Sequence, residues 1–312
     1  MPAIATLTLN PAVDLSVSVD RVEPERKLRA RDLRYDAGGG GINVARMVQR
    51  LGGETVAVFT AGGASGARLR ALLAAEHTPC RVVAIAQETR QDFTARDQAS
   101  GQQFRFVMPG PRLTSAEQSR ALAELATLTP SPDILVASGS LPPGVAPGFY
   151  GRLSRHTRRL RHRLALDASG AELSAGLAAG VWLVKPNLRE LEGHCGARLP
   201  DEASRVAACR TLVAAGAAKV VALSLGAQGA LLVGADGAWR ADPLDVTPVS
   251  AVGAGDSFMA GLVWALAAGR RPPDALRWAV AAASATLLAP GTHLGRRADV
   301  RQLAPSVRVR GL

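Results

Sequence analysis

The sequence predicts an α/β protein: one mostly parallel sheet flanked by helices, with a small separate β-sheet. Short apolar runs alternate with Ala-, Leu- and Arg-rich segments of helical periodicity, as the crossovers between parallel strands require. Apolar residues make up 47% of the 312 residues and aromatic residues only 4%, which favours helices packed on a sheet over an aromatic-rich β-sandwich. Two further segments show the strict polar/apolar alternation of half-exposed strands.

The strands of the main sheet are expected at short, bounded apolar runs. Residues 4–9 form the first run, and a four-glycine turn at 38–41 then precedes a helical pattern over 42–51. The order strand, glycine turn, helix, strand is typical of the opening of an α/β chain. The other strands are expected at residues 55–60, 134–137, 164–167, 182–185 and 220–223.

Two segments, at about residues 13–35 and 81–109, interrupt this alternation of strands and helices. They predict the small sheet. Polar and apolar residues alternate at 14–19 and again at 103–107. A charged sheet inserted in the first third of the chain is well placed to form a lid over the carboxyl ends of the main strands, where ligands bind in open α/β sheets. We therefore expect residues 1–312 to form a single domain with an inserted lid.

Composition excludes several classes of protein. The net charge is +11, but the basic residues are scattered arginines without interleaved aromatic residues, so no nucleic-acid partner is expected. The three cysteines are isolated from one another, which predicts neither a disulfide framework nor a zinc site. The chain contains no apolar run of membrane-spanning length and no secretory leader pattern, so we expect a cytoplasmic protein with no membrane partner.

The segment Gly253-Ala254-Gly255-Asp256, followed by an apolar-periodic stretch from Met259, predicts a tight turn that opens a long helix. Backbone N–H groups at a helix N-terminus favour negative charge, so the turn is suited to hold a developing phosphoryl charge. The Asp256 carboxylate would then accept a proton from an attacking hydroxyl. The turn alone is equally compatible with an aspartate that merely caps the helix.

Paired with the four-glycine run and Asn43, this turn resembles the two signatures of the ribokinase/PfkB family of sugar kinases. The resemblance covers essentially the whole chain and implies a ribokinase-like fold. Its other motifs are Thr8-Leu9-Asn10-Pro11 with Asp14, Lys185-Pro186-Asn187 with Glu190, Ser224-Leu225-Gly226 with Gly229, and Gly291-Thr292. Residues 27–29, 104–110 and 139–144 are most similar to the minor-type bacterial 6-phosphofructokinase branch of the family.

The resemblance implies a site for a phosphorylated sugar. Asp14, Gly39 and Asn43 would hold the sugar, and Ser140 is placed with them, although an asparagine such as Asn43 is more often simply a helix-start residue. The cations implied for the sugar phosphate are Lys27, Arg29, Arg90 and Arg105, all within the lid segments. Taken singly, each could be a solvated charge. The resemblance also implies a homodimer through paired lid sheets, in which Lys27 enters the neighbouring site.

On the nucleotide side, the resemblance implies that Lys185 and Asn187 contact the phosphates of ATP. A loop containing Ser224, Gly226 and Gly229 would follow the nucleotide, and Ser284 would lie near the purine. Glu190 would organise Mg²⁺ through water, although a carboxylate in the first turn of a helix is an equally good interpretation of its spacing. A possible K⁺ site would use backbone oxygens at Ser250, Val252, Thr286, Ala289, Gly291 and His293.

The activity implied is transfer of the γ-phosphoryl group of ATP to the 1-hydroxyl of fructose 6-phosphate. Tagatose 6-phosphate and fructose 1-phosphate are the nearest alternative acceptors. Family members that act on fructose 1-phosphate usually carry Lys within the glycine run, where this sequence has Gly40. A non-catalytic sugar-phosphate sensor is a further alternative, because fold alone does not fix function. A nucleic-acid-binding protein is another, and it predicts salt-sensitive retention on DNA.

Overall fold

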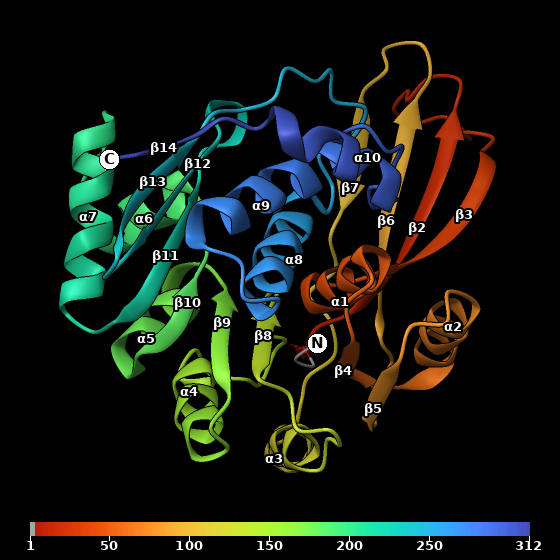
Figure 1. Ribbon diagram of the computed structural model, residues 1–312. Coiled ribbons are helices and arrows are strands. Elements are labelled where there is room, and N and C mark those ends of the chain that lie inside the picture. Colours follow the sequence, from red (N-terminus) through yellow and green to blue (C-terminus); the bar gives the residue numbers. More distant parts are fainter. Residues whose placement is uncertain (1–3) are drawn as a thin grey trace.

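Parallel strands form most of the main sheet in the computed structural model, which describes residues 4–312 (Figure 1). The strand order is β14-β13-β12-β11-β10-β9-β8-β1-β4-β5. The parallel strands are β1 (Ile4–Thr8), β4 (Thr55–Ala61), β5 (Cys80–Ala84), β8 (Ile134–Ser138), β9 (Arg163–Asp167), β10 (Val181–Val184) and β11 (Ala218–Ser224). The antiparallel strands are β12 (Ala230–Gly234), β13 (Gly237–Ala241) and β14 (Val309–Gly311).

Helices cover both faces of this sheet, so its central strands are buried throughout. Every residue of β1 and β8 is buried, as in a parallel sheet packed on two sides. The helices of one face are α3 (Ser115–Ala126), α4 (Phe149–Arg159), α5 (Gly170–Ala179), α6 (Leu188–Cys195) and α7 (Glu202–Ala214). The helices of the other face are α1 (Gly40–Leu51), α8 (Ala254–Ala267), α9 (Pro272–Leu287) and α10 (Arg297–Leu303).

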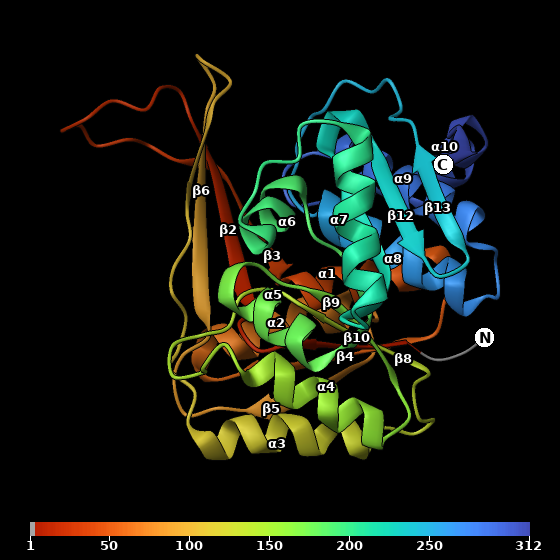
Figure 2. The same cartoon turned by 90° about the vertical axis from the view of Figure 1, so that its left-hand side faces the viewer.

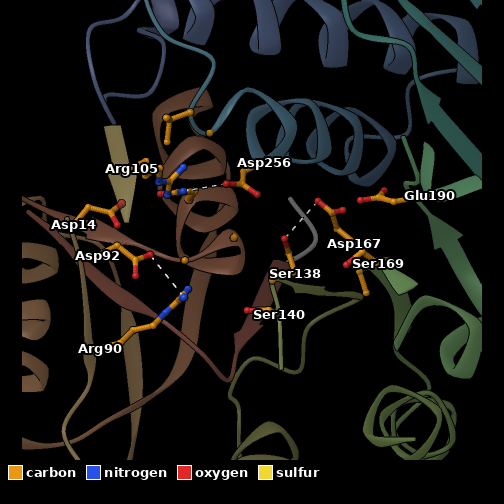
Figure 3. Close-up of a pocket in the computed structure, with 17 residues that line it drawn as sticks. Asp14, Arg90, Asp92, Arg105, Ser138, Ser140, Asp167, Ser169, Glu190 and Asp256 are labelled. Carbon is orange, nitrogen blue, oxygen red and sulfur yellow. Dashed lines mark hydrogen bonds and ion pairs between the residues drawn. The ribbon is translucent and has the colours of Figure 1, made fainter. Parts of the chain in front are cut away.

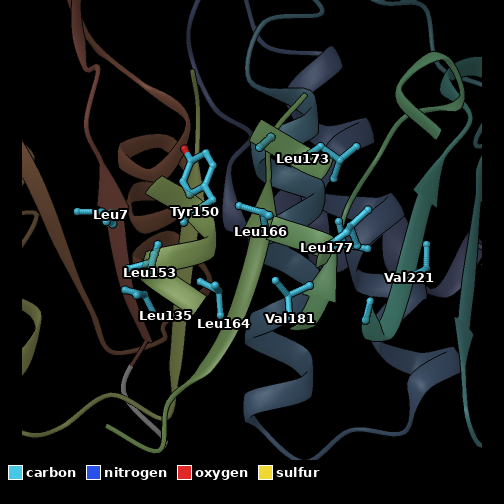
Figure 4. Packing of buried hydrophobic residues seen from close by; sticks show 14 of the residues in the cluster. Leu7, Leu135, Tyr150, Leu153, Leu164, Leu166, Leu173, Leu177, Val181 and Val221 are labelled. Atoms are coloured by element: carbon cyan, nitrogen blue, oxygen red, sulfur yellow. The ribbon is translucent and has the colours of Figure 1, made fainter. Parts of the chain in front are cut away.

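The hydrophobic core on the α3–α7 face joins leucines from the strands to helices α4 and α5 (Figure 4). Leu135 and Leu166 of the sheet are fully buried in the same cluster as Tyr150 and Leu153 of α4. Packing of this kind fixes the strands rigidly relative to one another. The side chains that follow the carboxyl ends of the strands are therefore held in place. Across residues 4–312, no helix combines the length and apolar character needed to cross a membrane.

A four-stranded small sheet lies beside the main sheet, in the order β3-β2-β6-β7 (Figures 1 and 2). Its strands are β2 (Ala12–Val19), β3 (Arg31–Gly38), β6 (Arg90–Asp97) and β7 (Gln103–Phe106), and β2 pairs with β6 in parallel. Helix α2 (Gly63–Ala75) packs between the two sheets through Leu69 and Leu73. The α/β fold with a separate small sheet is thus confirmed.

The predicted start of the second lid segment, residue 81, differs from the structure. Cys80–Ala84 is the edge strand β5, and it pairs in parallel with β4 of the main sheet. This strand is half-exposed and carries Arg81, so it lacks the continuous apolar run that marked the central strands. The antiparallel strands β12, β13 and β14 were also absent from the prediction.

Candidate active site

The turn at residues 253–256, called the glycine turn below, opens α8. Gly253 precedes the helix with φ 76°, a left-handed conformation that suits glycine, and a Cβ there would lie 2.9 Å from Leu294 Cδ2. No side chain caps the helix. The Asp256 carboxylate instead accepts a hydrogen bond from Asn43 Nδ2 at 2.9 Å, between residues 213 positions apart in the chain. The capping interpretation of Asp256 is therefore wrong.

The glycine turn lies between two cavities. Gly253 and Asp256 line the first, of about 310 Å³, which we call the polar cavity (Figure 3). Ala254 and Gly255 line the second, of about 730 Å³, which we call the apolar cavity. A group bound at the turn can therefore be approached from both sides.

The polar cavity collects most of the residues predicted to bind the sugar. Its lining includes the predicted residues Asp14, Gly39, Asn43, Arg90, Arg105, Ser140, Glu190 and Val252. Figure 3 shows Asp14, Arg90 and Arg105 on the side of the small sheet and Asp256 and Glu190 on the side of the main sheet. Segments remote in sequence thus meet around one polar space.

Asp256 lies in an environment that disfavours its charge. Its pKa is raised from the ordinary 3.8 to about 7, first by burial and second by repulsion from Asp167. The hydrogen bond from Asn43, the cation of Lys185 and a hydrogen bond from Ser138 act in the opposite direction. A carboxyl with a pKa near neutrality is suited to exchange a proton with a hydroxyl group.

Lys185 lies beneath the glycine turn and forms an ion pair with Asp167, Nζ to Oδ1 at 3.1 Å. Burial alone would lower the pKa of Lys185, but the carboxylates of Asp167, Asp256 and Glu190 raise it overall. A Cβ added to Gly255 would lie 3.7 Å from Lys185 Nζ, so the ammonium group is close to the turn. The predicted position of Lys185 at the phosphate end of the site is compatible with this geometry.

Asp167 and Ser138 line the polar cavity but were missed from the sequence. Each is the last residue of a parallel strand, β9 and β8 respectively. The carboxyl ends of parallel strands are the expected place for ligands, so their position at strand ends was an available signal. The two side chains face each other, with Ser138 Oγ and Asp167 Oδ2 3.5 Å apart (Figure 3).

The small-sheet side of the polar cavity contains a charge array that includes Asp92, also missed from the sequence. Arg90 donates hydrogen bonds to the carbonyl oxygens of Met108 and Asn10 at 2.8 and 3.1 Å, and its Nη1 lies 3.7 Å from Asp92 Oδ2. Burial raises the pKa of Asp14 to about 6, and Arg105 acts against this increase. The array places cations beside a carboxyl group able to bind hydroxyls.

The apolar cavity contains the residues predicted to contact a nucleotide. Asn187, Ser224, Gly226, Gly229 and Ser284 all line it. Its larger apolar lining residues include Leu244, Val246, Pro248, Phe258, Val280 and Leu287. A mostly apolar cavity with a few polar groups is typical of sites for small organic ligands.

Glu190 lies where a divalent cation would relieve electrostatic repulsion. One of its oxygens accepts from Asn187 N at 2.8 Å in a capping box, so the helix-start interpretation is correct for that oxygen. Burial, followed by the neighbouring Asp167, nevertheless raises the Glu190 pKa. Residues 4–312 contain no cluster of three or more His, Cys, Asp or Glu side chains that could hold a metal. Glu190 beside Asp167 suits a Mg²⁺ ion that would take most of its ligands from phosphates and water.

The positions predicted for a K⁺ site belong to two segments that contact each other beside the glycine turn. Ser250 Oγ donates to the Gly291 carbonyl at 2.6 Å, and Val252 N donates to Ser250 Oγ at 3.3 Å. Ala289 N donates to the Thr286 carbonyl, and His293 N donates to that of Pro290. The structure thus brings these positions together, although some of their carbonyl oxygens already accept hydrogen bonds.

Lys27 and Arg29 lie outside both cavities. They belong to the exposed loop between β2 and β3, which projects from the body of the molecule (Figure 2). Within one chain the structure does not bring them to the other predicted residues. A sequence pattern could not distinguish them from Arg90 and Arg105, since all four lie in the lid segments.

Comparison with known proteins gives extensive similarity. Residues 7–298 match the pfkB family carbohydrate kinases. The chain is 46% identical over 301 residues to ATP-dependent 6-phosphofructokinase isozyme 2 of Mycobacterium tuberculosis, covering 96% of this chain and 88% of the relative. It is 41% identical over 306 residues to the isozyme 2 of Escherichia coli, covering 97% and 98%. The 1-phosphofructokinase of Escherichia coli is 34% identical over 281 residues, covering 90% and 89%.

Solved structures of phosphofructokinase-2 from Escherichia coli have the same fold. The structure in complex with potassium has a TM-score of 0.94 at 39% identity, and that in complex with fructose-6-phosphate 0.92 at 38%. The tetrameric inhibited form also gives 0.92 at 38%. Each comparison covers 98% of this chain and 99% of the other. With the glycine turn and its aspartate between two cavities, these similarities show that the chain belongs to the PfkB family of carbohydrate kinases.

Proposed function

We propose that this kinase transfers the γ-phosphoryl group of ATP to the 1-hydroxyl of fructose 6-phosphate. The observation that carries the proposal is the position of the glycine turn, with Asp256 in the polar cavity and Gly255 in the apolar cavity. A sugar phosphate in the first and a nucleotide in the second would meet at the turn. The similarity to ATP-dependent 6-phosphofructokinases supports the same acceptor.

Each part of the site has a role in this proposal. Asp14, Asn43 and the backbone at Gly39 bind the sugar, and Arg90 and Arg105 bind its phosphate, for which guanidinium groups are well suited. Asp256 accepts the proton of the attacking hydroxyl. The backbone N–H groups of the glycine turn and the Lys185 cation stabilise the charge on the transferred group. ATP would extend through the apolar cavity toward Ser284.

Mg²⁺, organised near Glu190, would neutralise phosphate charge during the transfer when it is bound. We also propose that backbone oxygens of residues 250–252 and 286–293 bind a K⁺ ion. This site is supported by the potassium complex of the Escherichia coli relative.

Gly40 favours fructose 6-phosphate over fructose 1-phosphate as the acceptor. A Cβ on Gly40 would lie 2.2 Å from Ser138 Oγ and 3.1 Å from the Ser138 carbonyl carbon. A lysine at this position would therefore require the Ser138 hydroxyl to rotate away and the Ser138 backbone to move slightly. The cavity instead obtains its positive charge from Arg90 and Arg105.

The acceptor is tested by measuring ATP-dependent ADP release with Mg²⁺ and K⁺. Fructose 6-phosphate, tagatose 6-phosphate, fructose 1-phosphate and ribose are compared at equal concentrations. We expect the highest kcat/KM with fructose 6-phosphate. A preference for another sugar phosphate would replace only the acceptor, whereas inactivity on all four would leave the non-catalytic sensor as the better explanation.

The pH profile should report on Asp256. Because its pKa is raised to about 7, kcat/KM should increase as the pH rises through about 7, where the base loses its proton. Asp167→Asn removes a carboxylate that repels Asp256. The rise of kcat/KM with pH should therefore occur at lower pH in this variant than in the wild type. The check is kcat/KM from pH 5.5 to 9 for both proteins. If the rise of kcat/KM in Asp167→Asn instead moves to higher pH, this account of the site is contradicted.

We also propose that two copies associate through the small sheet. This sheet carries exposed apolar side chains, including Leu33 at 62% and Phe106 at 53% exposure. Large exposed apolar groups on one sheet are typical of an interaction surface. In such a dimer the projecting loop would carry Lys27 toward the neighbouring polar cavity.

Substituting Leu33→Asp should therefore dissociate the dimer and raise KM for the sugar phosphate. Sedimentation velocity and kinetics on the same preparation measure the two effects. The matched control is Leu312→Asp, which changes an exposed leucine at 39% exposure beyond β14 and should alter neither property. A Leu33→Asp variant that keeps the wild-type mass would eliminate this interface.

A further inference from the structure

Arg46 is an almost fully buried cation that lines neither the polar nor the apolar cavity. It lies on α1 with 2% exposure and forms a bidentate pair with Glu76, Nε to Oε2 at 2.7 Å and Nη2 to Oε1 at 2.6 Å. Its remaining nitrogen, Nη1, donates to the Ala37 carbonyl at 3.0 Å and to Asn43 Oδ1 at 3.2 Å. The guanidinium group thus joins α1, the end of β3 and the C-terminal end of α2.

The contact with Asn43 decides which way that amide points. Arginine has only donors, so the atom of Asn43 that faces Arg46 must be the carbonyl oxygen Oδ1. The amide nitrogen Nδ2 then faces the opposite way and donates to Asp256 Oδ2 at 2.9 Å. Positions 43 and 46 are three residues apart, so their side chains share one face of α1. A hydrogen-bonded chain therefore runs from Glu76 through Arg46 and Asn43 to Asp256.

We propose that Arg46 is a positioning residue for catalysis, holding the Asn43 amide in the orientation that donates to Asp256. The proposal rests on the proposed function of Asp256 as the base. Without Arg46, Asn43 could rotate and present its oxygen to the carboxylate, which would disfavour the ionised base. Glu76 in turn holds Arg46, because both of its oxygens accept from the guanidinium group.

The other groups that face Asp256 do not touch Arg46. Asp167 ends β9, Lys185 follows β10 and Ser138 ends β8, and each influences the Asp256 carboxyl from the main-sheet side. The contact from α1 is made by Asn43 alone. An effect of Arg46 on the base should therefore pass through Asn43. A direct effect of the Arg46 charge would instead persist when Asn43 is removed.

The test is a double-mutant cycle of Arg46→Met and Asn43→Leu, with kcat/KM for fructose 6-phosphate measured from pH 5.5 to 9. Loss of one hydrogen bond to a charged group corresponds to about one pH unit, so Arg46→Met should move the acidic limb upward and lower kcat/KM below it about tenfold. In the Asn43→Leu background the same change should move the limb no further. A shift of equal size in both backgrounds, or no shift with wild-type Asn43, would overturn the proposal.

A control separates positioning from loss of stability. Arg277 also pairs with a carboxylate and a backbone carbonyl, Asp274 and Val307, but it lines neither cavity. Arg277→Met should lower the melting temperature and leave the acidic limb of the kcat/KM pH profile unchanged. If it moves the limb as Arg46→Met does, the effect is a general consequence of destabilisation and the proposal fails.

A readout independent of activity distinguishes this proposal from the proposed function. The carboxyl resonance of Asp256, assigned with Asp256→Asn, can be titrated by carbon-13 NMR in the absence of substrates. Arg46→Met should raise its titration midpoint even if the kinase reaction proves to use another acceptor. Activity on fructose 6-phosphate with an unchanged midpoint would refute the positioning role alone. If the wild-type protein is inactive on fructose 6-phosphate but Arg46→Met still raises the titration midpoint of Asp256, only the proposed function is refuted.

Discussion

Asp256→Asn should lower kcat for fructose 6-phosphate by about 10²–10⁴-fold, the usual contribution of a positioned general base. Asparagine keeps the size of the side chain and can still accept from Asn43, so substrate binding should change little. The loss should therefore appear in kcat, with KM for both substrates within about threefold of wild type. Near-normal turnover in this variant would remove Asp256 from the mechanism.

The same substitution should stabilise the folded protein at alkaline pH. Folding raises the pKa of Asp256 from 3.8 to about 7, so the native state holds the proton more tightly than the unfolded chain does. This contribution to stability is present below pH 3.8 and is lost as the pH rises through about 7. The melting temperature of Asp256→Asn should exceed that of wild type at pH 8.5, and the difference should shrink as the pH falls toward 4. A variant that is less stable at pH 8.5 would contradict the buried environment of this carboxyl.

Lys185→Met should reduce both activity and stability. The ammonium group lies close to Gly255, and loss of one group that stabilises the reacting charge costs about a hundredfold or more in kcat. The change also leaves Asp167 and Asp256 together without their cation. Removing one partner of a buried ion pair typically destabilises a protein by about 3 kcal/mol. Urea unfolding measures this loss, which should be larger at pH 8 than at pH 5 because protonation relieves the repulsion.

The double variant Lys185→Met/Asp167→Asn separates the two effects. Removing the Asp167 charge should restore most of the stability lost in Lys185→Met. It should not restore kcat, since the cation near the glycine turn is still missing. Recovery of activity together with stability would mean that Lys185 acts only by neutralising Asp167.

Local patterns were sufficient to predict the main strands and the glycine turn. Strands such as residues 134–137 are continuous apolar runs, because a parallel sheet buried on both faces requires them. The left-handed Gly253 was likewise visible as a glycine before a long helical pattern. The edge strand at Cys80–Ala84 was not found, because a half-exposed strand needs no distinctive pattern.

The sequence by itself thus determined the fold class, the family resemblance and the candidate base, because these depend on local chemistry and on motifs of fixed spacing. Only the tertiary structure decided which candidates share a cavity: Arg90 and Arg105 line it, whereas Lys27 and Arg29 lie on a projecting loop. It also decided that Asp256 accepts from Asn43 instead of capping its helix, and that Asp167 and Arg46 belong to the surroundings of the site. The physical reason is that hydrogen bonds, burial and charge repulsion act between atoms within a few ångströms, and residues far apart in the chain reach such distances only when the sheets and helices pack.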